Sequence, residues 1–422
     1  MTQPQVVSQS ELLSRANKKA KTTKTNEKKN HATRNHHEIS YVEFYSGIGG
    51  WTMALEEAVT KLPSKHTLKR IAALDHSDLC TNVFQHNFGT DKKAFNIERL
   101  TVKQVNEWNA TIWAMSPPCQ PHTRQHNNQS EDLKDPRSAS FLHLCDLLEL
   151  MTTPPKLLCL ENVIGFESSR SFQRWEEVLQ GRGYRVGHFH LTPTQVGLPN
   201  DRPRYFCIAV RSEDDSGKSS EMGPTEASLL APYFEHHIRT AENEGTTSST
   251  RVPNIRVAVP EVGIQQPNND TGDPPCLPPL SSFLDDTADD TLTIPQKVIE
   301  KNAAWCFDIV TPSNSRSSCF TSSYGRYMKG TGSVLYPESS GISIPLIPPE
   351  QREFQTDWAK DLDTSKLRYF SGTEMARLFG FQTGFSFPSS ISTRQQWKLV
   401  GNSLNVRVAA RLVELGLKVM IR

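Results

Sequence analysis

Short apolar runs alternate with segments of helical periodicity over the first half of the chain. We expect strands at 39–44, 70–75, 111–115, 156–160, 184–191 and 204–211. We expect helices at 51–62, 79–86, 141–151 and 171–180, where apolar residues recur at the spacing of one helix face. Strands that alternate with helices in this order predict a doubly wound, Rossmann-like α/β sheet.

The pattern changes after residue 211. Residues 212–294 are rich in Ser, Thr, Asp and Pro, a composition that resists packing, so we expect a flexible insertion there. Aromatic and glycine residues are more frequent over 295–366, and helical periodicity returns at 371–379 and 403–418.

These changes divide the chain into three predicted parts. Residues 1–38 are polar and Lys-rich with few apolar anchors, so we expect a disordered basic tail. Residues 39–211 and 367–422 together form the predicted α/β domain. Residues 212–366 form a smaller inserted module that contains the flexible stretch.

Composition and charge constrain the class of protein. With 422 residues, of which 36% are hydrophobic, the chain is long enough for a sizeable core and a second module. The net charge is only +1, but residues 1–38 carry eight Lys or Arg against three Glu, and residues 212–294 carry four against fifteen Asp or Glu. The remainder is mildly basic, which is compatible with a polyanionic partner. Three interpretations of the tail remain open. It could contact a phosphate backbone, it could be a nuclear localisation signal, or it could be a solvated segment with no specific role.

The eight cysteines show no CxxC pair and no Cys/His cluster with zinc spacing, so we expect no metal. No secretory signal opens the chain, and no apolar run has the length of a membrane span. We therefore expect an intracellular protein, in cytoplasm or nucleus, with reduced thiols, no membrane association and a monomeric state.

The first strand runs into a glycine-rich turn, Phe44 to Gly50. Glycines at a strand-to-helix junction let the backbone approach a ligand and leave helix N–H groups free. The spacing of Gly47, Gly49 and Gly50 lacks the full GxGxxG fingerprint. The turn alone fits a nucleotide phosphate, S-adenosylmethionine, or no ligand.

Polar residues end the next two segments. Asp75 suits hydrogen bonding to ribose hydroxyls, or it is an ordinary helix N-cap. His76 could pack over an adenine ring, or it is an ordinary loop residue. Asn96 could hydrogen-bond the edge of an adenine.

A stiff loop carries the candidate nucleophile. Pro117, Pro118 and Pro121 restrict the backbone around Cys119 at the end of a predicted strand. A rigid loop at this edge suits a cysteine aimed at a substrate, whereas a structural cysteine needs no such frame.

Two further segments offer charged groups at the same edge. Glu161 follows a strand and suits proton donation to a base, or it is an N-cap or surface carboxylate. Asn200, Arg202 and Arg204 alternate along an extended segment, so we expect them to point together into one site. Surface arginines beside a strand are the alternative.

In this order the motifs resemble the cytosine-5 methyltransferase superfamily over residues 41–210 and 367–417. The segments that carry the resemblance are Phe44 to Gly50, Pro117 to Gln120, Glu161-Asn162-Val163, Asn200-x-Arg202-x-Arg204 and Gly401-Asn402-Ser403. Asn200 stands where the family usually has Gln.

Cys319-Phe320-Thr321, Tyr324-Gly325 and 330–334 are similar to the tRNA methyltransferase branch, the "type 2" DNA methyltransferase homologues. This resemblance implies that S-adenosylmethionine is the cofactor and that a tRNA anticodon-loop cytosine, usually in tRNA-Asp, is the substrate. It also implies a catalytic domain at 39–211 plus 367–422 and a target-recognition module at 212–366.

The resemblance implies a role for each matching residue. The implied catalytic residues are Cys119, Glu161, Arg202 and Arg204. The implied cofactor-binding residues are Phe44, Gly47, Ile48, Gly49, Gly50, Asp75, His76, Asn96, Ile97, Pro117, Asn402 and Ser403. The implied substrate-binding residues are Gln120, Asn162, Asn200, Cys319 and Thr321.

Three other hypotheses remain at this stage. A DNA cytosine-5 methyltransferase would use the same chemistry, and the Cys-Phe-Thr element favours RNA over it. A silent RNA-binding protein would not need all four catalytic residues. A nicotinamide-dependent oxidoreductase would need the complete glycine fingerprint.

Overall fold

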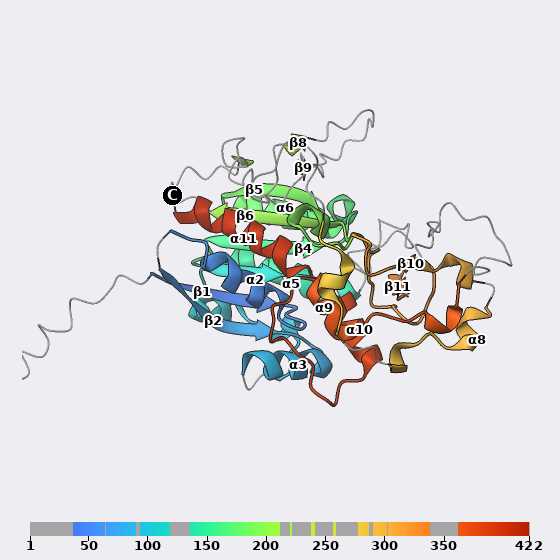
Figure 1. Cartoon of the computed structure of the whole chain (residues 1–422). Coiled ribbons are helices and arrows are strands. Elements are labelled where there is room, and N and C mark those ends of the chain that lie inside the picture. Colours follow the sequence, from blue (N-terminus) through green and yellow to red (C-terminus); the bar gives the residue numbers. More distant parts are fainter. Residues whose placement is uncertain are drawn as a thin grey trace, which may run out of the picture.

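The computed structural model describes residues 37–63, 65–89, 93–118, 136–211, 220–221, 238–240, 256–258, 277–286, 290–301, 303–337 and 362–421 (Figure 1). Nearly all of the predicted basic tail and most of the predicted flexible stretch lie outside these ranges. Their disorder therefore stays a prediction.

A mixed sheet forms the centre of the molecule. Its main strands are β1 (His37–Phe44), β2 (His66–Leu74), β3 (Ile112–Met115), β4 (Leu157–Asn162), β5 (Tyr184–Leu191) and β6 (Arg204–Arg211). Their spatial order is β2-β1-β3-β4-β6-β5; the first four are parallel, and β6 runs antiparallel to both of its neighbours. The short strands β7 (Ser220–Glu221), β8 (Ile238–Thr240) and β9 (Arg256–Ala258) extend the β5 side. The α/β class predicted from the sequence is confirmed.

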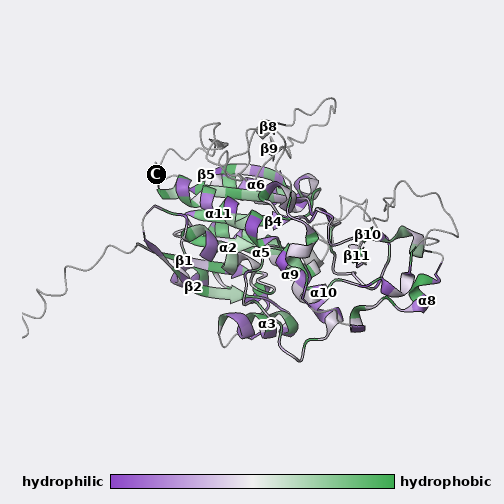
Figure 2. Ribbon diagram, in the orientation of Figure 1, coloured by the Kyte–Doolittle hydropathy of each residue, from purple (hydrophilic) through white to green (hydrophobic). Residues whose placement is uncertain are grey.

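Helices cover both faces of this sheet, and the strands supply a core to each. The helices are α2 (Gly50–Val59), α3 (Asp78–Phe88), α4 (Val102–Trp108), α5 (Pro136–Leu150), α6 (Arg170–Gly181), α9 (Gly372–Leu378), α10 (Thr393–Gly401) and α11 (Val406–Ile421). Side chains alternate along a strand. Tyr41 and Ile112 therefore pack on the α2–α11 side, whereas Val42 and Trp113 pack on the α5–α6 side. Figure 2 shows hydrophobic residues in these central strands.

The second module lies to one side of the sheet (Figure 1). It contains α8 (Gln296–Ile299) and the parallel pair β10 (Asp308–Val310) and β11 (Ser333–Leu335). Backbone hydrogen bonds between Leu335 and Arg368, 2.8 and 3.0 Å, join it to the returning chain.

Order resumes earlier than the composition of the insertion suggests. Within the stretch expected to be flexible, Leu280 and Leu292 are buried in the larger core cluster. Asp285 pairs with Arg377 of α9 at 2.8 Å. The end of the 212–294 range is therefore a packed part of the fold.

The C-terminal elements differ in detail from expectation. The helix expected at 403–418 begins at Val406, and Asn405 stays outside it, accepting a hydrogen bond from the Val408 N–H with its side chain. The helix α10 was not predicted.

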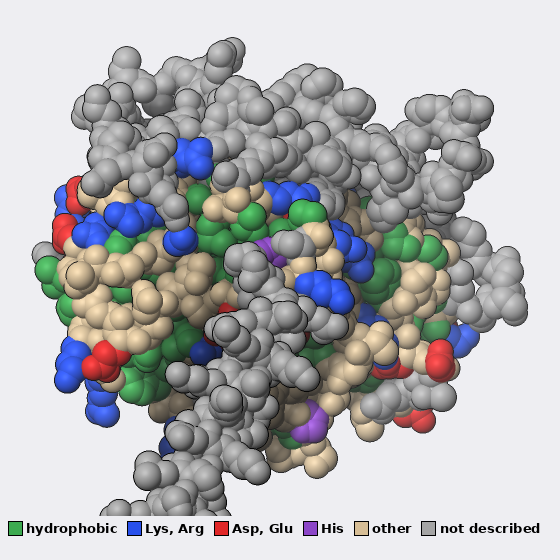
Figure 3. All heavy atoms as spheres, turned by 90° about the vertical axis from the view of Figure 1, so that its left-hand side faces the viewer, with side chains coloured by type: hydrophobic (Ala, Val, Ile, Leu, Met, Phe, Trp, Pro, Cys, Tyr) green, Lys and Arg blue, Asp and Glu red, His purple; other side chains and the backbone are tan. Residues whose placement is uncertain are grey.

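Within the described residues, no helix is both long and apolar enough to cross a bilayer. On the face that Figure 3 presents, basic and acidic side chains are dispersed rather than gathered into one patch.

Candidate active site

The turn after β1 is anchored by a buried acid. Glu43, 1% exposed, accepts hydrogen bonds from the N–H groups of Trp51 (3.1 Å) and Thr52 (3.2 Å) and from the Thr52 hydroxyl (2.6 Å). A carboxylate at a helix N-terminus is stabilised by the free N–H groups there. Sequence analysis missed this residue, whose only signal is an acid in an otherwise apolar strand.

Two glycines of the turn allow close packing. Gly49 has φ +92°, and a Cβ there would lie 2.2 Å from the Phe88 ring. A Cβ on Gly50 would lie 2.9 Å from Leu404 and 3.3 Å from the Ser403 hydroxyl. The last predicted motif therefore lies directly against the first.

Gly47 differs from these two because the space beside it is open. Its φ is +48°, and the nearest atom to an added Cβ is the Tyr45 carbonyl oxygen at 3.9 Å. Its N–H donates to Asp75 Oδ2 at 2.8 Å. A small residue with free space beside its backbone suits close approach by a ligand.

Asp75 links two turns at the sheet edge. Besides Gly47, the Ser77 N–H donates to its carboxylate at 2.9 Å, and the Phe95 N–H donates to its carbonyl at 2.7 Å. The N-cap of α3 is Ser77, so the alternative of Asp75 as that cap is wrong. A carboxylate has further lone pairs, so these bonds leave it able to accept from a ribose hydroxyl.

The neighbouring predicted cofactor residues have different environments. His76 is exposed, and Asn96 accepts a hydrogen bond from the Glu98 N–H with its side chain. Ile97 and Phe44 pack in the core, with the Phe44 ring 4.8 Å from that of Trp113.

Two hydrogen bonds hold the first residues of the stiff proline loop. Trp51 Nε1 donates to the Ser116 hydroxyl at 3.0 Å, and Asn162 Nδ2 donates to the Pro117 carbonyl at 3.4 Å. Cys119 and Gln120 lie outside the described residues.

An acid and a cation face each other at the adjoining edge of the sheet. Glu161 is the next-to-last residue of β4, and Arg204 begins the antiparallel β6, so both reach the same edge. Arg204 Nε lies 3.6 Å from Glu161 Oε1, and the Glu161 residue is 8% exposed.

The same arginine lies near a thiol of the second module. Arg204 Nη2 is 3.9 Å from Cys319 Sγ, and Arg202 Nη1 is 3.4 Å from it. Burial alone would raise the pKa of the Cys319 thiol, but the two guanidinium groups outweigh it, and the pKa is lowered.

Arg202 ties three segments together. Its guanidinium donates to the carbonyls of Phe320 (2.8 Å), Gly401 (3.0 Å) and Ser403 (2.7 Å), and it stacks 4.7 Å from the centre of the Phe379 ring. Asn200, fully buried, donates to the Ser317 hydroxyl (3.1 Å) and the Ser318 carbonyl (2.9 Å). Asn200, Arg202 and Arg204 all reach the segment 317–320, but Arg202 and Asn200 do so as structural ties.

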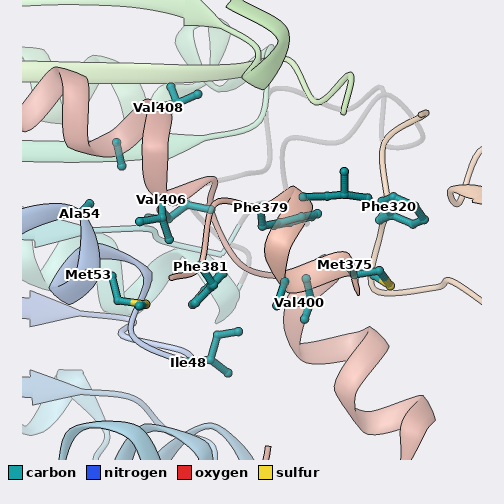
Figure 4. Close-up of a cluster of buried hydrophobic side chains, with 14 of the residues drawn as sticks. Ile48, Met53, Ala54, Phe320, Met375, Phe379, Phe381, Val400, Val406 and Val408 are labelled. Carbon is teal, nitrogen blue, oxygen red and sulfur yellow. The ribbon is translucent and has the colours of Figure 1, made fainter. Parts of the chain in front are cut away.

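Hydrophobic packing supports this junction. Figure 4 shows Ile48, Val406, Phe379 and Phe320, from four separate parts of the chain, within one cluster. Thr321, next to Phe320, donates its N–H to the Thr331 carbonyl at 3.0 Å.

Comparison with known proteins decides the family. The model of the C-5 cytosine-specific DNA methylase family matches residues 39–415. The chain belongs to this family.

This chain aligns with nearly the whole length of several curated relatives. A mouse protein named tRNA (cytosine(38)-C(5))-methyltransferase is 34% identical over 89% of this chain and 92% of its own. A Dictyostelium discoideum protein named DNA (cytosine-5)-methyltransferase is 30% identical over 89% of this chain and 94% of its own. The resemblance found from the motifs is confirmed.

Solved structures agree with the methylase fold. The Dnmt2 methyltransferase of S. pombe superposes with a TM-score of 0.67 at 25% identity, covering 91% of this chain and 99% of its own. The Entamoeba histolytica methyltransferase EhMeth gives the same TM-score, identity and coverage.

Most of the methylase motifs meet at one edge of the sheet. The turn at 47–50, Asp75, Pro117, Glu161, Arg204, Cys319 and the 401–403 loop are joined by the contacts above. Asn402 is exposed there, and Ser403 contributes its carbonyl. In the part of the chain that the structure describes, no three His, Cys, Asp or Glu side chains gather as metal ligands.

A separate hollow of about 390 Å³ lies between α2, β2, α3 and the loop at 382–385. It is lined by Met53, Glu56, Arg70, Asn87, Phe88, Gln382, Thr383, Gly384 and Phe385. None of the predicted cofactor residues of the methylase lines it, so it is distinct from the candidate site.

Proposed function

We propose that this chain methylates C5 of a cytosine in tRNA, at an anticodon-loop position of the tRNA-Asp type. The observation that carries the proposal is the meeting of Glu161, Arg204 and Cys319 beside the proline loop, in a chain 34% identical to a named tRNA (cytosine(38)-C(5))-methyltransferase. An RNA loop suits this chemistry because its bases leave the stack at lower cost than those of a duplex.

In the proposed reaction Cys119 is the nucleophile. Its thiolate adds to C6 of the cytosine, which makes C5 an enamine carbon able to accept a methyl group. Glu161, in its protonated form, donates a hydrogen bond to N3 and offsets the charge that develops as sulfur adds. Once C5 carries the methyl group, a base removes the C5 proton, and the electron pair of that C–H bond restores the ring and expels the Cys119 thiolate.

Arg204 and Arg202 support this step differently. Arg204, beside Glu161, lies where it can hold the acid in place and contact the base or its phosphate. Arg202 keeps the walls of the site together through the three carbonyls it binds.

The residues at the carboxyl ends of β1 and β2 fit S-adenosylmethionine. When bound, this cofactor supplies the methyl group. The open space beside Gly47 allows the backbone to approach it, and the Asp75 carboxylate has free lone pairs for a ribose hydroxyl. His76, Asn96, Pro117 and the 402–403 loop would surround the rest.

We also propose a domain organisation for the chain. Residues 39–211 and 367–422 would form the catalytic domain, and 212–366 the target-recognition module, in which Cys319, Thr321, Asn200 and Asn162 line or support the substrate side. We propose a monomer that acts in cytoplasm or nucleus.

Replacement of the nucleophile tests the proposal. Cys119→Ala should abolish methyl transfer from tritiated cofactor to tRNA while cofactor binding, followed by thermal shift, persists. Cys80→Ala, a matched replacement of another cysteine, should keep wild-type turnover. Turnover by Cys119→Ala would refute the assigned nucleophile.

DNA is the alternative substrate, because the Dictyostelium relative is named a DNA methyltransferase. Parallel assays with tRNA and duplex DNA separate the two. A higher rate on DNA would replace the RNA proposal.

A further inference from the structure

One large aromatic side chain is exposed on the second module. Among the described residues, three large hydrophobic side chains are exposed: Leu150 (64%), Tyr327 (55%) and Ile421 (48%). Leu150 and Ile421 are the last residues of α5 and α11, where helix ends normally meet solvent. Tyr327 instead lies in the middle of a loop, with no helix end to account for its exposure.

The loop is fixed at its base. The Thr321 N–H donates to the Thr331 carbonyl at 3.0 Å, which closes the loop between residues 322 and 330. The Thr331 hydroxyl donates to the Tyr327 carbonyl at 2.7 Å. The Tyr327 N–H donates to the Ser323 carbonyl at 3.2 Å. The outward position of Tyr327 therefore belongs to a defined turn.

The other tyrosine of the loop points inward and anchors it. Tyr324 is 4% exposed, and its hydroxyl donates to the Ser333 carbonyl at 2.6 Å. Its ring lies 5.3 Å from that of Trp397. Gly325 also meets this tryptophan, since an added Cβ would lie 2.3 Å from its ring. One tyrosine of the loop is thus part of the core, and the other is 55% exposed.

One cation contacts the exposed ring, and a second lies in the same loop. The guanidinium carbon of Arg326 lies 5.2 Å from the centre of the Tyr327 ring, and Lys329 is exposed two residues further on. The sequence from 322 to 330 contains no Asp or Glu. An exposed aromatic face beside two cations is the combination that binds an unpaired nucleotide, because the ring stacks on the base and the cations contact phosphates.

The loop is close in sequence to the candidate active site. It begins three residues after Cys319, whose thiol lies 3.9 Å from Arg204 Nη2. The base of the loop also lies against the 401–403 segment, since a Cβ added to Gly401 would lie 2.2 Å from the Thr321 carbonyl carbon.

We propose that Tyr327, with Arg326 and Lys329, stacks an unpaired nucleotide of the substrate RNA that flanks the target cytosine. This proposal rests on the proposed function, because it requires an RNA substrate. It adds a specificity element outside the reacting groups. A protein partner that uses the same ring is the competing occupant.

Kinetics with an anticodon stem-loop RNA test the stacking. Tyr327→Ala should raise KM by about 5- to 150-fold with little change in kcat, the range found when a stacked base loses its aromatic partner. Tyr327→Phe keeps the ring and should stay near wild type. Leu150→Ala, which removes an equally exposed side chain elsewhere, should have no effect.

An RNA series identifies the stacked nucleotide. Abasic substitutions at each loop position beside the target cytosine should weaken wild-type binding at one position, and that substitution should cost Tyr327→Ala no further affinity. Unchanged KM in Tyr327→Ala, loss of kcat alone, or an abasic effect of equal size in both proteins would overturn the proposal. A wild-type enzyme that methylates no RNA would instead refute the proposed function.

Discussion

Arg202 and Arg204 are two residues apart and have the same side chain, yet their surroundings differ. Both lie near the Cys319 thiol, but Arg202 is 3% exposed and bonds three backbone carbonyls, whereas Arg204 lies beside the Glu161 carboxylate. A guanidinium has five donors in a fixed fork, so it can bridge carbonyls from separate segments. The same residue type therefore joins separate backbone segments at position 202 and pairs with a carboxylate at position 204.

Glu167 stabilises the turn that follows the Glu161 motif. Its carboxylate accepts hydrogen bonds from His190 Nε2 and from the Gly165 N–H, both at 2.9 Å. Burial alone would raise the pKa of Glu167, but these hydrogen bonds outweigh it, and the pKa is lowered. The turn and strand β5 are thereby joined behind the candidate site.

This pair predicts a pH dependence of stability. A carboxyl whose pKa is lowered on folding stabilises the protein above the unfolded pKa, and the stabilisation is lost as pH falls through the folded pKa. Glu167→Gln should therefore reduce the free energy of unfolding at neutral pH and lose less on acidification than wild type. Urea unfolding between pH 7 and pH 3 measures this.

The other titratable groups nearby are shared by both proteins. His190, His188, Glu176 and Tyr205 keep their identity in the variant, so the difference between the two pH profiles reports the contact between Glu167 and His190. Parallel profiles for wild type and Glu167→Gln would contradict the assignment.

Sequence patterns identified site residues at strand ends but not their supports. Asp75 and Glu161 were predicted from their positions at the ends of strands, and Arg204 from its alternation with Asn200 and Arg202 along an extended segment. Glu43 was missed because its partners, Trp51 and Thr52, become neighbours only when α2 folds back over β1. The structural task of Arg202 also depends on carbonyls that are over 100 residues away in sequence.

At the scale of elements, the predicted strands and helices agree with the structure to within a few residues over 39–211. The boundaries are least accurate where tertiary contacts set them. Asn405 bonds the Leu378 carbonyl and keeps Ser403 and Leu404 outside α11, which periodicity alone places inside it. The helix α10 is short and its residues are polar on average, so the hydrophobic pattern did not predict it.

The last residue of α10 packs against the second module without space for a side chain. A Cβ on Gly401 would lie 2.2 Å from the Thr321 carbonyl carbon and 2.4 Å from the Ser322 nitrogen. Backbone atoms cannot move aside as a flexible side chain can. Gly401→Ala should therefore lower the free energy of unfolding by about 1–3 kcal/mol or more, as overpacking does.

Gly181 is the matched control for this change. It ends α6, and nothing lies within 4 Å of an added Cβ. Gly181→Ala should be neutral or stabilising by up to about 1 kcal/mol. Equal stability of the two variants in urea would contradict the packing account.

At the scale of the whole molecule, one side chain joins the cofactor side to the substrate side. Arg202 binds the carbonyls of Gly401 and Ser403, next to the Gly50 turn, and the carbonyl of Phe320, next to Cys319. Because one guanidinium bonds both segments, we expect binding at one of them to affect the other.

This connection predicts cooperative binding. RNA should lower the Kd of S-adenosylhomocysteine, chosen to prevent turnover, and the nucleoside should lower the Kd of RNA by the same factor. Arg202→Lys, which cannot span three carbonyls, should reduce that factor. Calorimetric titration of each ligand with and without the other measures it. A variant with the wild-type factor would exclude Arg202 as the link.

The reversed direction of β6 limits how the chain can vary in length. Leu191 pairs with Arg204, and Glu161 pairs with Phe206, so the connection 192–203 sets which residue meets which. Side chains alternate between faces, so a slip of one residue would turn Arg204 to the opposite face of the sheet. A deletion or insertion of one residue within β6 itself would therefore remove Arg204 from the face that carries Glu161, whereas a change in the connection 192–203 can be accommodated without a shift of register.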